Sequence, residues 1–326
     1  MNDLKEKIKA LVATDLAEIE TALKDNLNPH YELVEKIAGH LLYSGGKRLR
    51  PLLMVLSARL CNYNGTDDKK FSVLFEYLHA ATLLHDDLVD EAALRRGKKV
   101  AHLVFGNSET VLTGDFLLAR SLSLAAATRK PDLISVIAKI TEDMSQGEIQ
   151  QLYNKGRLDL SEAEYTDVIE RKTAVLIRGA CHSGALIADA NQQKADALIQ
   201  YGYCLGIAFQ LADDLLDYTA DSEALGKETG ADLREGKLTL PVIYALEKAD
   251  VNDRDEMKKI IKNETFSKEE FAYLTKLLEK YGGLSYTKEK AIDNINKAKE
   301  ALLVFEESET RQILGLLADY ALVRKV

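Results

Sequence analysis

Apolar residues recur along this chain every three or four positions, the spacing of one face of an α-helix. Between residues 3 and 24 the apolar positions are Leu4, Ile8, Leu11, Val12, Leu16, Ile19 and Leu23. The same spacing predicts further helices at 30–43, 51–61, 69–92, 108–128, 131–154, 161–189 and 192–220. Charged segments with helical spacing continue over 250–309, and strand-like alternation is not convincing anywhere. The pattern therefore predicts an all-α protein.

Glycine, proline and polar clusters mark the ends of these helices. The glycine pair in SGG (44–46) ends the second predicted helix. Proline is favoured in the first helical turn, so Pro51 and Pro241 are each expected to begin a helix. Segment 220–240 is rich in glycine and charge and is expected to be a loop. Because no proline- or serine-rich linker divides the chain, we predict a single domain over 1–326.

Composition narrows the function classes. Of 326 residues, 46% are hydrophobic and only 4 are proline, which favours a helical core. A formal charge of −9 argues against nucleic acid as the main partner, since binding its backbone requires a basic face.

The chain carries no pattern typical of export. Its three widely spaced cysteines offer neither a disulfide framework nor a CxxC metal site, which fits a reducing compartment. The N-terminal segment lacks the apolar core of a signal peptide, and no apolar run reaches the roughly 20 residues of a spanning helix. We therefore expect a cytoplasmic protein with at most peripheral membrane contact.

One acidic motif occurs twice, as DDLVD at 86–90 and as DDLLD at 213–217. On a helix, positions i and i+4 share a face, so Asp86 and Asp90 point the same way. The same holds for Asp213 and Asp217. Two such faces opposite each other would make a strongly negative pocket, which is unfavourable without a cation. Oxygen-only ligands select hard cations, and Mg²⁺ prefers a few carboxylates together with phosphate oxygens and water.

A single motif of this kind could be a solvated helix face or a helix end. Both copies, however, lie beside leucines, namely Leu83, Leu84, Leu88, Leu211, Leu215 and Leu216. Carboxylates in apolar helices are costly unless they are paired or bind a metal. The repetition therefore favours a metal site.

Basic clusters alternate with the acidic ones along the chain. Their members are Lys47, Arg48 and Arg50 in GGKRLRP (45–51), Arg95 and Arg96 after the first acidic motif, Lys172 beside Thr173, and Lys227 and Lys237 after the second acidic motif. Any one cluster alone would more often be plain surface. Together they suit a metal-bound polyphosphate, in which Mg²⁺ bridges carboxylate to phosphate while lysine and arginine bind the remaining oxygens.

With these motifs the chain resembles the trans-prenyltransferases, or all-trans polyprenyl diphosphate synthases. The resemblance covers nearly the whole chain and is carried by GGKRLRP (45–51), LHAATLLHDDLVDEAALRRGK (78–98), GDFLLAR (114–120), RKTAVL (171–176), GIAFQLADDLLDY (206–218) and LGKETGADLREGKLTLP (225–241). It implies a bundle of long helices around a deep central cavity, usually as a homodimer. It also implies head-to-tail joining of isopentenyl diphosphate to an allylic diphosphate.

The resemblance also assigns roles to individual residues. It implies that Asp86 and Asp90, with Asp213 opposite, hold Mg²⁺ on the allylic diphosphate. Weaker or indirect contributions to that metal site are implied for Asp87, Asp214 and Asp217. The allylic diphosphate would be bound by Arg95, Lys172, Lys227 and Lys237, and isopentenyl diphosphate by Lys47, Arg50, His79 and Arg96. Thr173 and Gln210 would line the reacting centre.

Physical chemistry agrees with these roles. Breaking the allylic C–O bond leaves a carbocation and a diphosphate anion, so cations that stabilise the anion supply the main catalytic effect. Dry aliphatic walls would keep water from the carbocation. The final proton would go to the departing diphosphate, so no protein base is assigned. A lone histidine is usually structural, but His79 shares a helical arc with Asp86 and Asp90, which favours a ligand role.

In this family the product grows down a tunnel below the first acidic motif, and bulky residues just upstream of it stop growth early. Here these positions are the small residues Ala81 and Thr82, which argues against a dedicated C15 enzyme. Phe75 lies three turns below Asp86 and could be the floor for a C20 product, or could turn aside. Floor candidates on the facing helix are Leu118, Ser121, Leu122 and Ala125. We expect a product of about C35–C45, as in octaprenyl and related long-chain synthases, with C20 as the main competitor.

Other function classes account for less of the sequence. An HD-type metal phosphohydrolase is suggested by His85–Asp86 but leaves the second acidic motif and GGKRLRP unexplained. A terpene cyclase usually needs an aromatic-lined cavity, and this chain has no tryptophan and 8 phenylalanines. A non-catalytic partner subunit would be expected to lack some of the acidic or basic site residues, which this chain keeps.

Overall fold

The computed structural model describes residues 2–219, 230–263 and 265–323, and nearly all of the regular structure in them is helical. The helices up to the middle of the chain are α1 (Asn2–Leu11), α2 (Ala13–Asp25), α3 (Glu32–Leu42), α4 (Leu49–Leu60), α5 (Asp68–Ser72), α6 (Leu74–Val89), α7 (Ala101–Phe105), α8 (Asn107–Ala127) and α9 (Pro131–Asn154). The later ones are α10 (Glu162–Ile169), α11 (Val175–Ile187), α12 (Gln192–Thr219), α14 (Ala231–Arg234), α15 (Leu240–Lys248), α16 (Val251–Ile261), α17 (Lys268–Lys280), α18 (Gly283–Ala301) and α19 (Glu309–Val323). The all-α prediction is confirmed.

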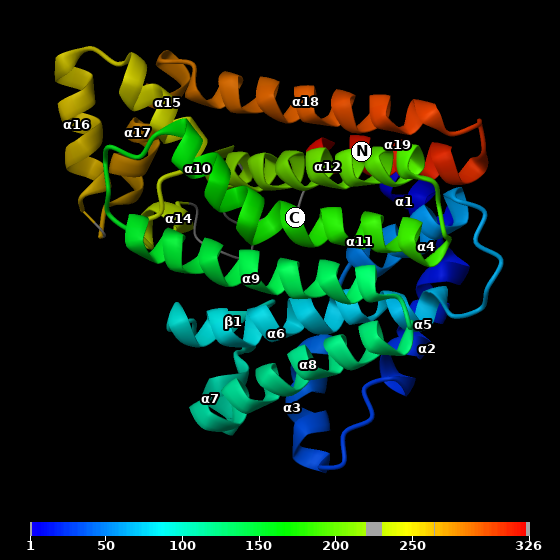
Figure 1. Ribbon diagram of the computed structural model, residues 1–326. Helices are drawn as coiled ribbons and strands as arrows, with labels where there is room; N and C mark the ends of the chain where they lie inside the picture. Colours follow the sequence, from blue (N-terminus) through cyan, green and yellow to red (C-terminus); the bar gives the residue numbers. More distant parts are fainter. Residues whose placement is uncertain (1, 220–229, 264, 324–326) are drawn as a thin grey trace.

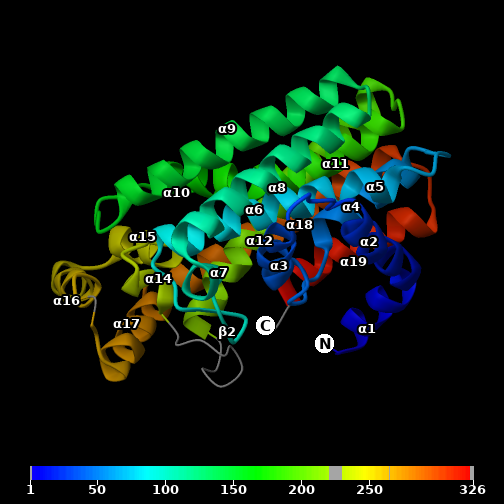
Figure 2. The same cartoon turned by 90° about the horizontal axis from the view of Figure 1, so that it is seen from below.

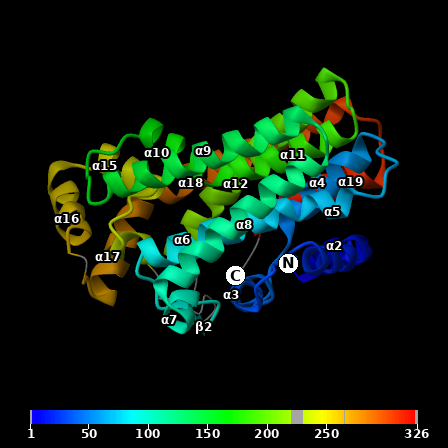
Figure 3. The ribbon, with the colours of Figure 1, turned by 60° about the horizontal axis from the view of Figure 1, so that its bottom comes forward.

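The long helices lie side by side as a bundle around α12. Helices α11 and α18 pack along α12 on either side, and α4 and α9 pack on α11 (Figures 1 and 2). Helices α6 and α8 form a close pair beside α9, and the short helices α14–α17 gather at one end (Figure 3). The bundle thereby brings α6 and α12, which carry the two acidic motifs, into one assembly.

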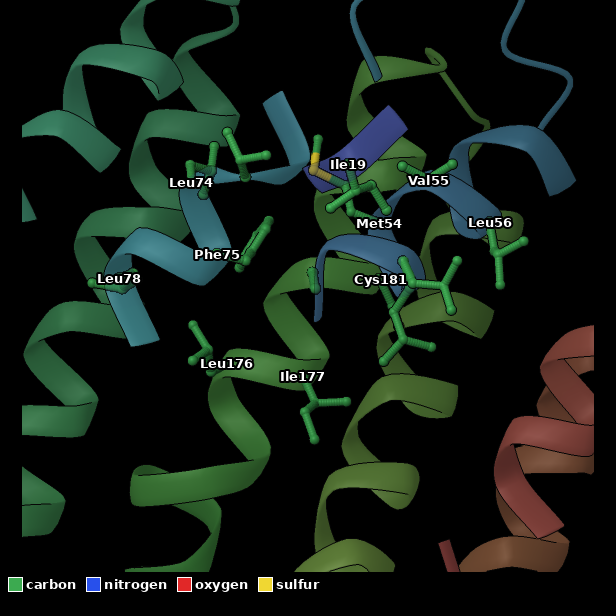
Figure 4. Close-up of a cluster of buried hydrophobic side chains, with 14 of the residues drawn as sticks. Ile19, Met54, Val55, Leu56, Leu74, Phe75, Leu78, Leu176, Ile177 and Cys181 are labelled. Atoms are coloured by element: carbon green, nitrogen blue, oxygen red, sulfur yellow. The ribbon is translucent and has the colours of Figure 1, made fainter. Parts of the chain in front are cut away.

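Buried aliphatic side chains hold the bundle together. The larger hydrophobic cluster joins α4, α6, α8, α11 and α12, and Figure 4 shows part of it, including Met54 of α4, Phe75 of α6 and Ile177 of α11. A second cluster joins α10, α12 and α15–α17, and Tyr203 and Leu322 pack against both clusters. Helix α12 contributes to both clusters, so it is the common support of the two regions.

Several predicted helices are divided in the structure. The helix expected at 3–24 is broken at Val12, and the one at 69–92 is broken at Val73 and ends at Val89. The helix expected at 161–189 contains a π-helical turn, η1 (Glu170–Ala174). Residues 250–309 form α16, α17, α18 and a short 3₁₀ turn, η2 (Leu302–Val304), before α19 begins. Such breaks preserve the apolar spacing on either side, which is why the pattern did not predict them.

Two other boundaries differ from the sequence prediction. Helix α4 begins at Leu49, so Pro51 lies inside its first turn rather than opening it. After the first acidic motif, β1 (Leu94–Arg95) pairs antiparallel with β2 (Lys98–Lys99). Positive φ angles at Arg96 and Gly97 form the turn between these strands. Two-residue strands are too short to show alternation.

Helix α8 exposes apolar side chains, among them Val111 and Leu112, on one side. Among the described helices, it alone is long and apolar enough to cross a membrane by length and composition, which the sequence analysis did not expect. Its other side packs on α6 through buried residues such as Leu117 and Leu124. A core helix of a bundle meets the same length and composition criteria.

Helices α4 and α11 cross so closely that only glycine fits at the contact. A Cβ atom on Gly184 would lie 2.5 Å from the Met54 carbonyl oxygen and 2.8 Å from the Ala58 backbone nitrogen. Backbone atoms cannot move aside as a flexible side chain can. At Gly315 in α19, by contrast, an added Cβ atom meets nothing within 4 Å.

We expect Gly184→Ala to lower the free energy of unfolding by about 1–3 kcal/mol, because it overpacks a backbone contact. The matched variant Gly315→Ala should be neutral or stabilising by up to about 1 kcal/mol, because alanine is the better helix former. Urea denaturation followed by circular dichroism measures both. Equal stability of the two variants would contradict the close crossing.

Candidate active site

The carboxylates of the first acidic motif have three different environments. Asp86 lies in the last turn of α6 and lines a cavity of about 430 Å³ inside the bundle. Asp90 caps the same helix and lies near two ammonium groups, Lys155 Nζ at 3.4 Å and Lys237 Nζ at 3.5 Å. Asp87 is buried and is bound by the Arg95 guanidinium through contacts of 2.7–3.0 Å. The motif thus directs Asp86 to the large cavity and commits Asp87 to a protein partner.

The second acidic motif lies in the last turns of α12, beside a second cavity of about 250 Å³. Asp213 and Asp214 both line it. The Asp214 carboxylate is almost fully buried and accepts hydrogen bonds from Gln210 Nε2 at 2.8 Å and from the Tyr165 hydroxyl. Asp217 accepts the backbone N–H groups of Ala231 and Asp232 at 3.1 and 3.2 Å, so it fixes the start of α14.

Lys172 and Thr173 connect the two cavities, because both residues line both. They belong to the π-helical turn η1, and such turns recur at functional sites. Lys172 Nζ lies 2.5 Å from Glu148 Oε2 and 2.6 Å from Gln151 Oε1. Thr173 donates to Gln210 Oε1 at 2.8 Å. The sequence analysis expected Thr173 and Gln210 at one reacting centre, and the structure brings these two side chains into contact.

The other expected diphosphate ligands are only partly at this site. Lys237 lines the smaller cavity and lies 2.5 Å from Glu235. Arg95 is held by Asp87. Lys227 falls outside the described residues.

Burial of Asp86 and Asp217 makes their ionised forms unfavourable in the absence of a cation. The pKa of Asp86 is raised to about 6, chiefly because burial removes the carboxylate from water; the Lys172 ammonium opposes this shift, and the Glu148 and Asp90 charges add to it. Burial likewise raises the pKa of Asp217. A bound cation would stabilise the ionised forms, so this donor set suits a hard divalent ion. Among the described residues, no group of three or more histidine, cysteine or carboxylate side chains is close enough to hold a metal by itself.

The GGKRLRP segment is fixed by its central arginine. Arg48 adopts a left-handed backbone conformation with φ of 46°, and its side chain is almost completely buried. It donates to Glu20 of α2 at 2.6 Å, to Glu76 of α6 at 2.7 Å and to the Leu42 carbonyl at 2.5 Å. The sequence analysis counted Arg48 with the anion-binding cluster, but these contacts make it a structural clamp between four helices.

Arg50 and His79 lie at the same cavity as Asp86. Among the described residues, Arg50 Nε has no hydrogen-bond partner although it is buried. Arg96 donates to the Gly45 carbonyl, which places it beside the GGKRLRP turn. Lys47 lies elsewhere: its ammonium is 5.6 Å from the Tyr320 ring, and it lines a separate apolar cavity between α1, α4 and α19.

Burial and the nearby guanidinium groups, Arg50 first among them, hold the pKa of His79 well below its usual value. The imidazole is therefore neutral at physiological pH. As a neutral ring it can donate one hydrogen bond to a phosphate oxygen but adds no charge.

Below the carboxylates the larger cavity is lined by small and aliphatic side chains. Ala81 and Thr82 line it as expected, and Leu118 is the one floor candidate from α8 that does so. Leu78 is the lining residue of α6 farthest from Asp86, about 12 Å along the helix axis. Phe75 is fully buried one turn below and does not line the cavity.

The remaining floor candidates are corrected by the structure. Leu122 is exposed on the outside of α8. Ser121 is buried against α6, with its hydroxyl 3.1 Å from the Leu74 carbonyl. Ala125 is buried in the core and does not line the cavity.

Helix α9 supplies site residues that the sequence analysis missed. Glu148, Gln151 and Lys155 contact Lys172 or Asp90, and Asn154 lines the smaller cavity. Asn154 accepts a hydrogen bond from Arg157 at 3.0 Å, and its buried amide nitrogen has no partner within the described part of the chain. The signal was present as polar residues three and four positions apart in GEIQQLYNK (147–155), the spacing of one helix face.

Comparisons with known proteins agree with this geometry. A sequence model described as polyprenyl synthetase matches residues 31–278. The chain is 36% identical over 319 residues to the octaprenyl diphosphate synthase of Escherichia coli (strain K12), with 98% of each protein covered. It is 40% identical over 243 residues to heptaprenyl diphosphate synthase component 2 of Geobacillus stearothermophilus, covering 74% of this chain and 76% of that protein.

The fold is shared with solved structures. A polyprenyl synthase from Caulobacter crescentus CB15, complexed with calcium and isoprenyl diphosphate, superposes with a TM-score of 0.91 at 38% identity, with 98% of each chain covered. The resemblance seen in the motifs is thereby confirmed over the length of the chain. This chain belongs to the polyprenyl synthetase family and is a prenyltransferase.

Proposed function

We propose that this protein is a Mg²⁺-dependent synthase that joins isopentenyl diphosphate head to tail to an allylic diphosphate and makes an all-trans product of about C35–C45. The observation that carries the proposal is the larger cavity. It has a carboxylate, Asp86, and the cations Arg50 and Lys172 at its polar part and aliphatic side chains below. Such a cavity suits a molecule with an anionic head and an apolar tail. The proposed catalytic unit is one domain over 1–326.

Asp86 and Asp90 on α6 and Asp213 on α12 are the proposed holders of the metal, and the calcium in the C. crescentus neighbour supports a divalent cation here. Bound Mg²⁺ would neutralise the charge that develops on the departing diphosphate. Because these carboxylates do not chelate a metal by themselves, the substrate's phosphate oxygens complete the coordination. Asp87 and Asp217 support the site through their contacts with Arg95 and the start of α14.

Cationic side chains of the protein bind the remaining phosphate oxygens. Lys172, Lys237 and Arg95 are proposed for the allylic diphosphate, and Lys227 completes this set by its motif. Arg50, His79 and Arg96 are proposed for isopentenyl diphosphate. Lys47 joins them only if its side chain leaves Tyr320. Lys172, Lys237, Arg95 and Arg96 all have acceptors in the protein, so substrate phosphates would replace existing contacts.

Thr173 and Gln210 lie where the allylic cation would form, and their oxygens can stabilise positive charge. The aliphatic wall excludes water from this cation. The proton lost in the last step passes to the diphosphate. An HD-type hydrolase would leave the second acidic motif without a role, and the ring of His85 is occupied by the Val111 carbonyl at 3.1 Å and the Asp115 carboxylate at 3.6 Å.

Product length depends on the depth of the larger cavity. Octaprenyl and heptaprenyl relatives, together with the small Ala81 and Thr82, support a long product. The cavity reaches Leu78, a depth of about two isoprene units of about 5 Å each. A longer product therefore requires Leu78 and Phe75 to shift, and C20 or C15 remains the alternative. A long product would suit the side chain of a quinone made in the cytoplasm.

Incubation with Mg²⁺, labelled isopentenyl diphosphate and farnesyl diphosphate should give a ladder ending at C35–C45, read by mass after dephosphorylation. Leu78→Phe should shorten the ladder, because it narrows the deepest lined position, and Asp86→Asn should lower turnover by about 100-fold or more. A stop at C20 in the wild type would overturn the long-chain proposal. Absence of condensation would overturn the single-chain enzyme.

His79 should also make stability depend on pH. Its pKa is lowered in the folded state from 6.5, so the unfolded chain binds more protons below that value. The contribution of the neutral ring is therefore complete above about pH 6.5 and is lost as the pH falls, by up to about 1.4 kcal/mol per pH unit. Denaturation from about pH 7 to about pH 5 should show a smaller loss of stability for His79→Gln than for the wild type. Parallel profiles would be inconsistent with a buried neutral histidine.

We further propose a homodimer that buries the apolar side of α7 and α8. Leu103, Val104, Val111 and Leu112 are exposed there, and Leu112 is 65% exposed. Exposed apolar patches of this kind mark interaction surfaces. The G. stearothermophilus relative is named component 2 of its synthase, so a different partner chain is the alternative.

Sedimentation equilibrium should show a dimer for the wild type and a monomer for Leu112→Glu, because a charge at this position would be buried in the interface. Leu303→Glu is the matched control, since Leu303 is also 65% exposed but lies in η2. It should remain dimeric. A monomeric wild type would contradict the homodimer.

A further inference from the structure

We propose that Asp214 and Tyr165 are positioning residues that fix the direction of the Gln210 and Thr173 dipoles at the reacting centre. Asp214 would then not be a metal ligand, although it belongs to the acidic motif. This inference rests on the proposed function, because it concerns the same reacting centre.

A continuous chain of hydrogen bonds joins four residues from three helical segments of the protein. Thr173 Oγ1 of η1 donates to Gln210 Oε1 of α12 at 2.8 Å. Gln210 Nε2 in turn donates to Asp214 Oδ1, one turn further along α12, at 2.8 Å. The Tyr165 hydroxyl of α10 donates to the other carboxylate oxygen, Asp214 Oδ2. Tyr165 and Asp214 are buried, whereas Thr173 and Gln210 are only partly so and line the smaller cavity.

The direction of every hydrogen bond in this chain follows from the carboxylate. Each carboxylate oxygen of Asp214 accepts a hydrogen bond, so the Gln210 amide presents its nitrogen to Asp214 Oδ1. Its carbonyl oxygen then faces Thr173 and accepts the hydroxyl proton. With that proton committed, the remaining lone pairs of Thr173 Oγ1 and Gln210 Oε1 are available to a positive charge. Reversing the amide would place two oxygens against each other.

Close packing holds the two ends of this chain in place. A Cβ atom on Gly206 of α12 would lie 2.5 Å from Ala174 Cα, so η1 and α12 touch through their backbones next to Thr173. Helix α10 is fixed at its start by a reciprocal hydrogen-bonded cap between Ser161 and Glu164. Tyr165 follows directly in that first turn. The segments η1 and α10, which carry Thr173 and Tyr165, are therefore held in place by the protein itself, without substrate.

The same contacts separate Asp214 from the metal site. Each of its oxygens already accepts a hydrogen bond from the protein, so a cation would have to compete with these buried donors for the carboxylate. Preorganised dipoles at a developing charge contribute strongly to rate, and loss of one such group typically lowers turnover by about 100-fold or more. Since the dipoles here remain present but lose their direction, we expect a decrease of about 10- to 100-fold.

Three variants distinguish positioning from metal binding. Tyr165→Phe removes the outer donor and keeps the ring, and Asp214→Leu removes the acceptor. Both should lower kcat by about 10- to 100-fold, with the KM of each substrate and the Mg²⁺ concentration for half-maximal rate unchanged. Asp214→Asn keeps an oxygen for Gln210 and should stay within about tenfold of the wild type. The control Asp213→Asn, at a proposed metal ligand, should raise the Mg²⁺ requirement.

A double-variant cycle tests whether the residues act as one chain. Adding Tyr165→Phe to Gln210→Ala should cost no further activity, because the dipole that Tyr165 helps to direct is already gone. An Asp214→Asn variant with the raised Mg²⁺ requirement of Asp213→Asn would overturn the inference, as would an equal loss from Tyr165→Phe with and without Gln210. These outcomes presuppose an active wild type. An inactive one would overturn the proposed function and this inference with it.

Discussion

Negative charge held inside an apolar bundle is the constraint on which the rest of the site depends. A carboxylate removed from water is unstable unless a cation or several N–H donors face it. The protein meets this requirement with its own groups: Arg95 faces Asp87, Lys155 and Lys237 face Asp90, and backbone N–H groups face Asp217. The interhelical contacts in this part of the bundle follow from these pairings. Under the proposed function, substrate phosphates and metal would enter a site whose charges already have partners, so binding would exchange these partners.

Because of these pairings, aspartates at equivalent positions of the two acidic motifs have different roles. Within DDLVD and DDLLD, the first aspartate of each motif lines a cavity while the second is buried against a protein donor. Asp87 is neutralised by a guanidinium, whereas Asp214 receives only uncharged donors. The difference lies in what neighbouring helices present to the second position. A motif thus specifies which residues can be buried as charges, and the packing around it determines what each charge does.

The sequence predicted those features that depend on local spacing. The helical class, the facing of α6 by α8 and the cavity positions of Ala81 and Thr82 follow from helix periodicity and from the motifs. The breaks at Val12 and Val73 and the π-helical turn could not be predicted from these patterns, because tertiary packing determines where a helix is interrupted. Glu148, Gln151 and Lys155 were missed because polar residues on an amphipathic helix usually face solvent. Lys47 was placed with Arg50 by sequence proximity, but the left-handed residue between them turns it to another cavity.

That left-handed residue has a consequence for the order of folding. Arg48 completes its contacts only when α2, the end of α3 and α6 are all in place, and its φ of 46° is unfavourable for a side chain without them. The GGKRLRP turn thus cannot acquire its final shape early, from local interactions alone. It forms after helices distant in the chain have docked. A form of the chain with its helices formed but not docked would therefore lack the GGKRLRP arrangement, and binding at the proposed isopentenyl diphosphate site would report on helix docking rather than on helix formation.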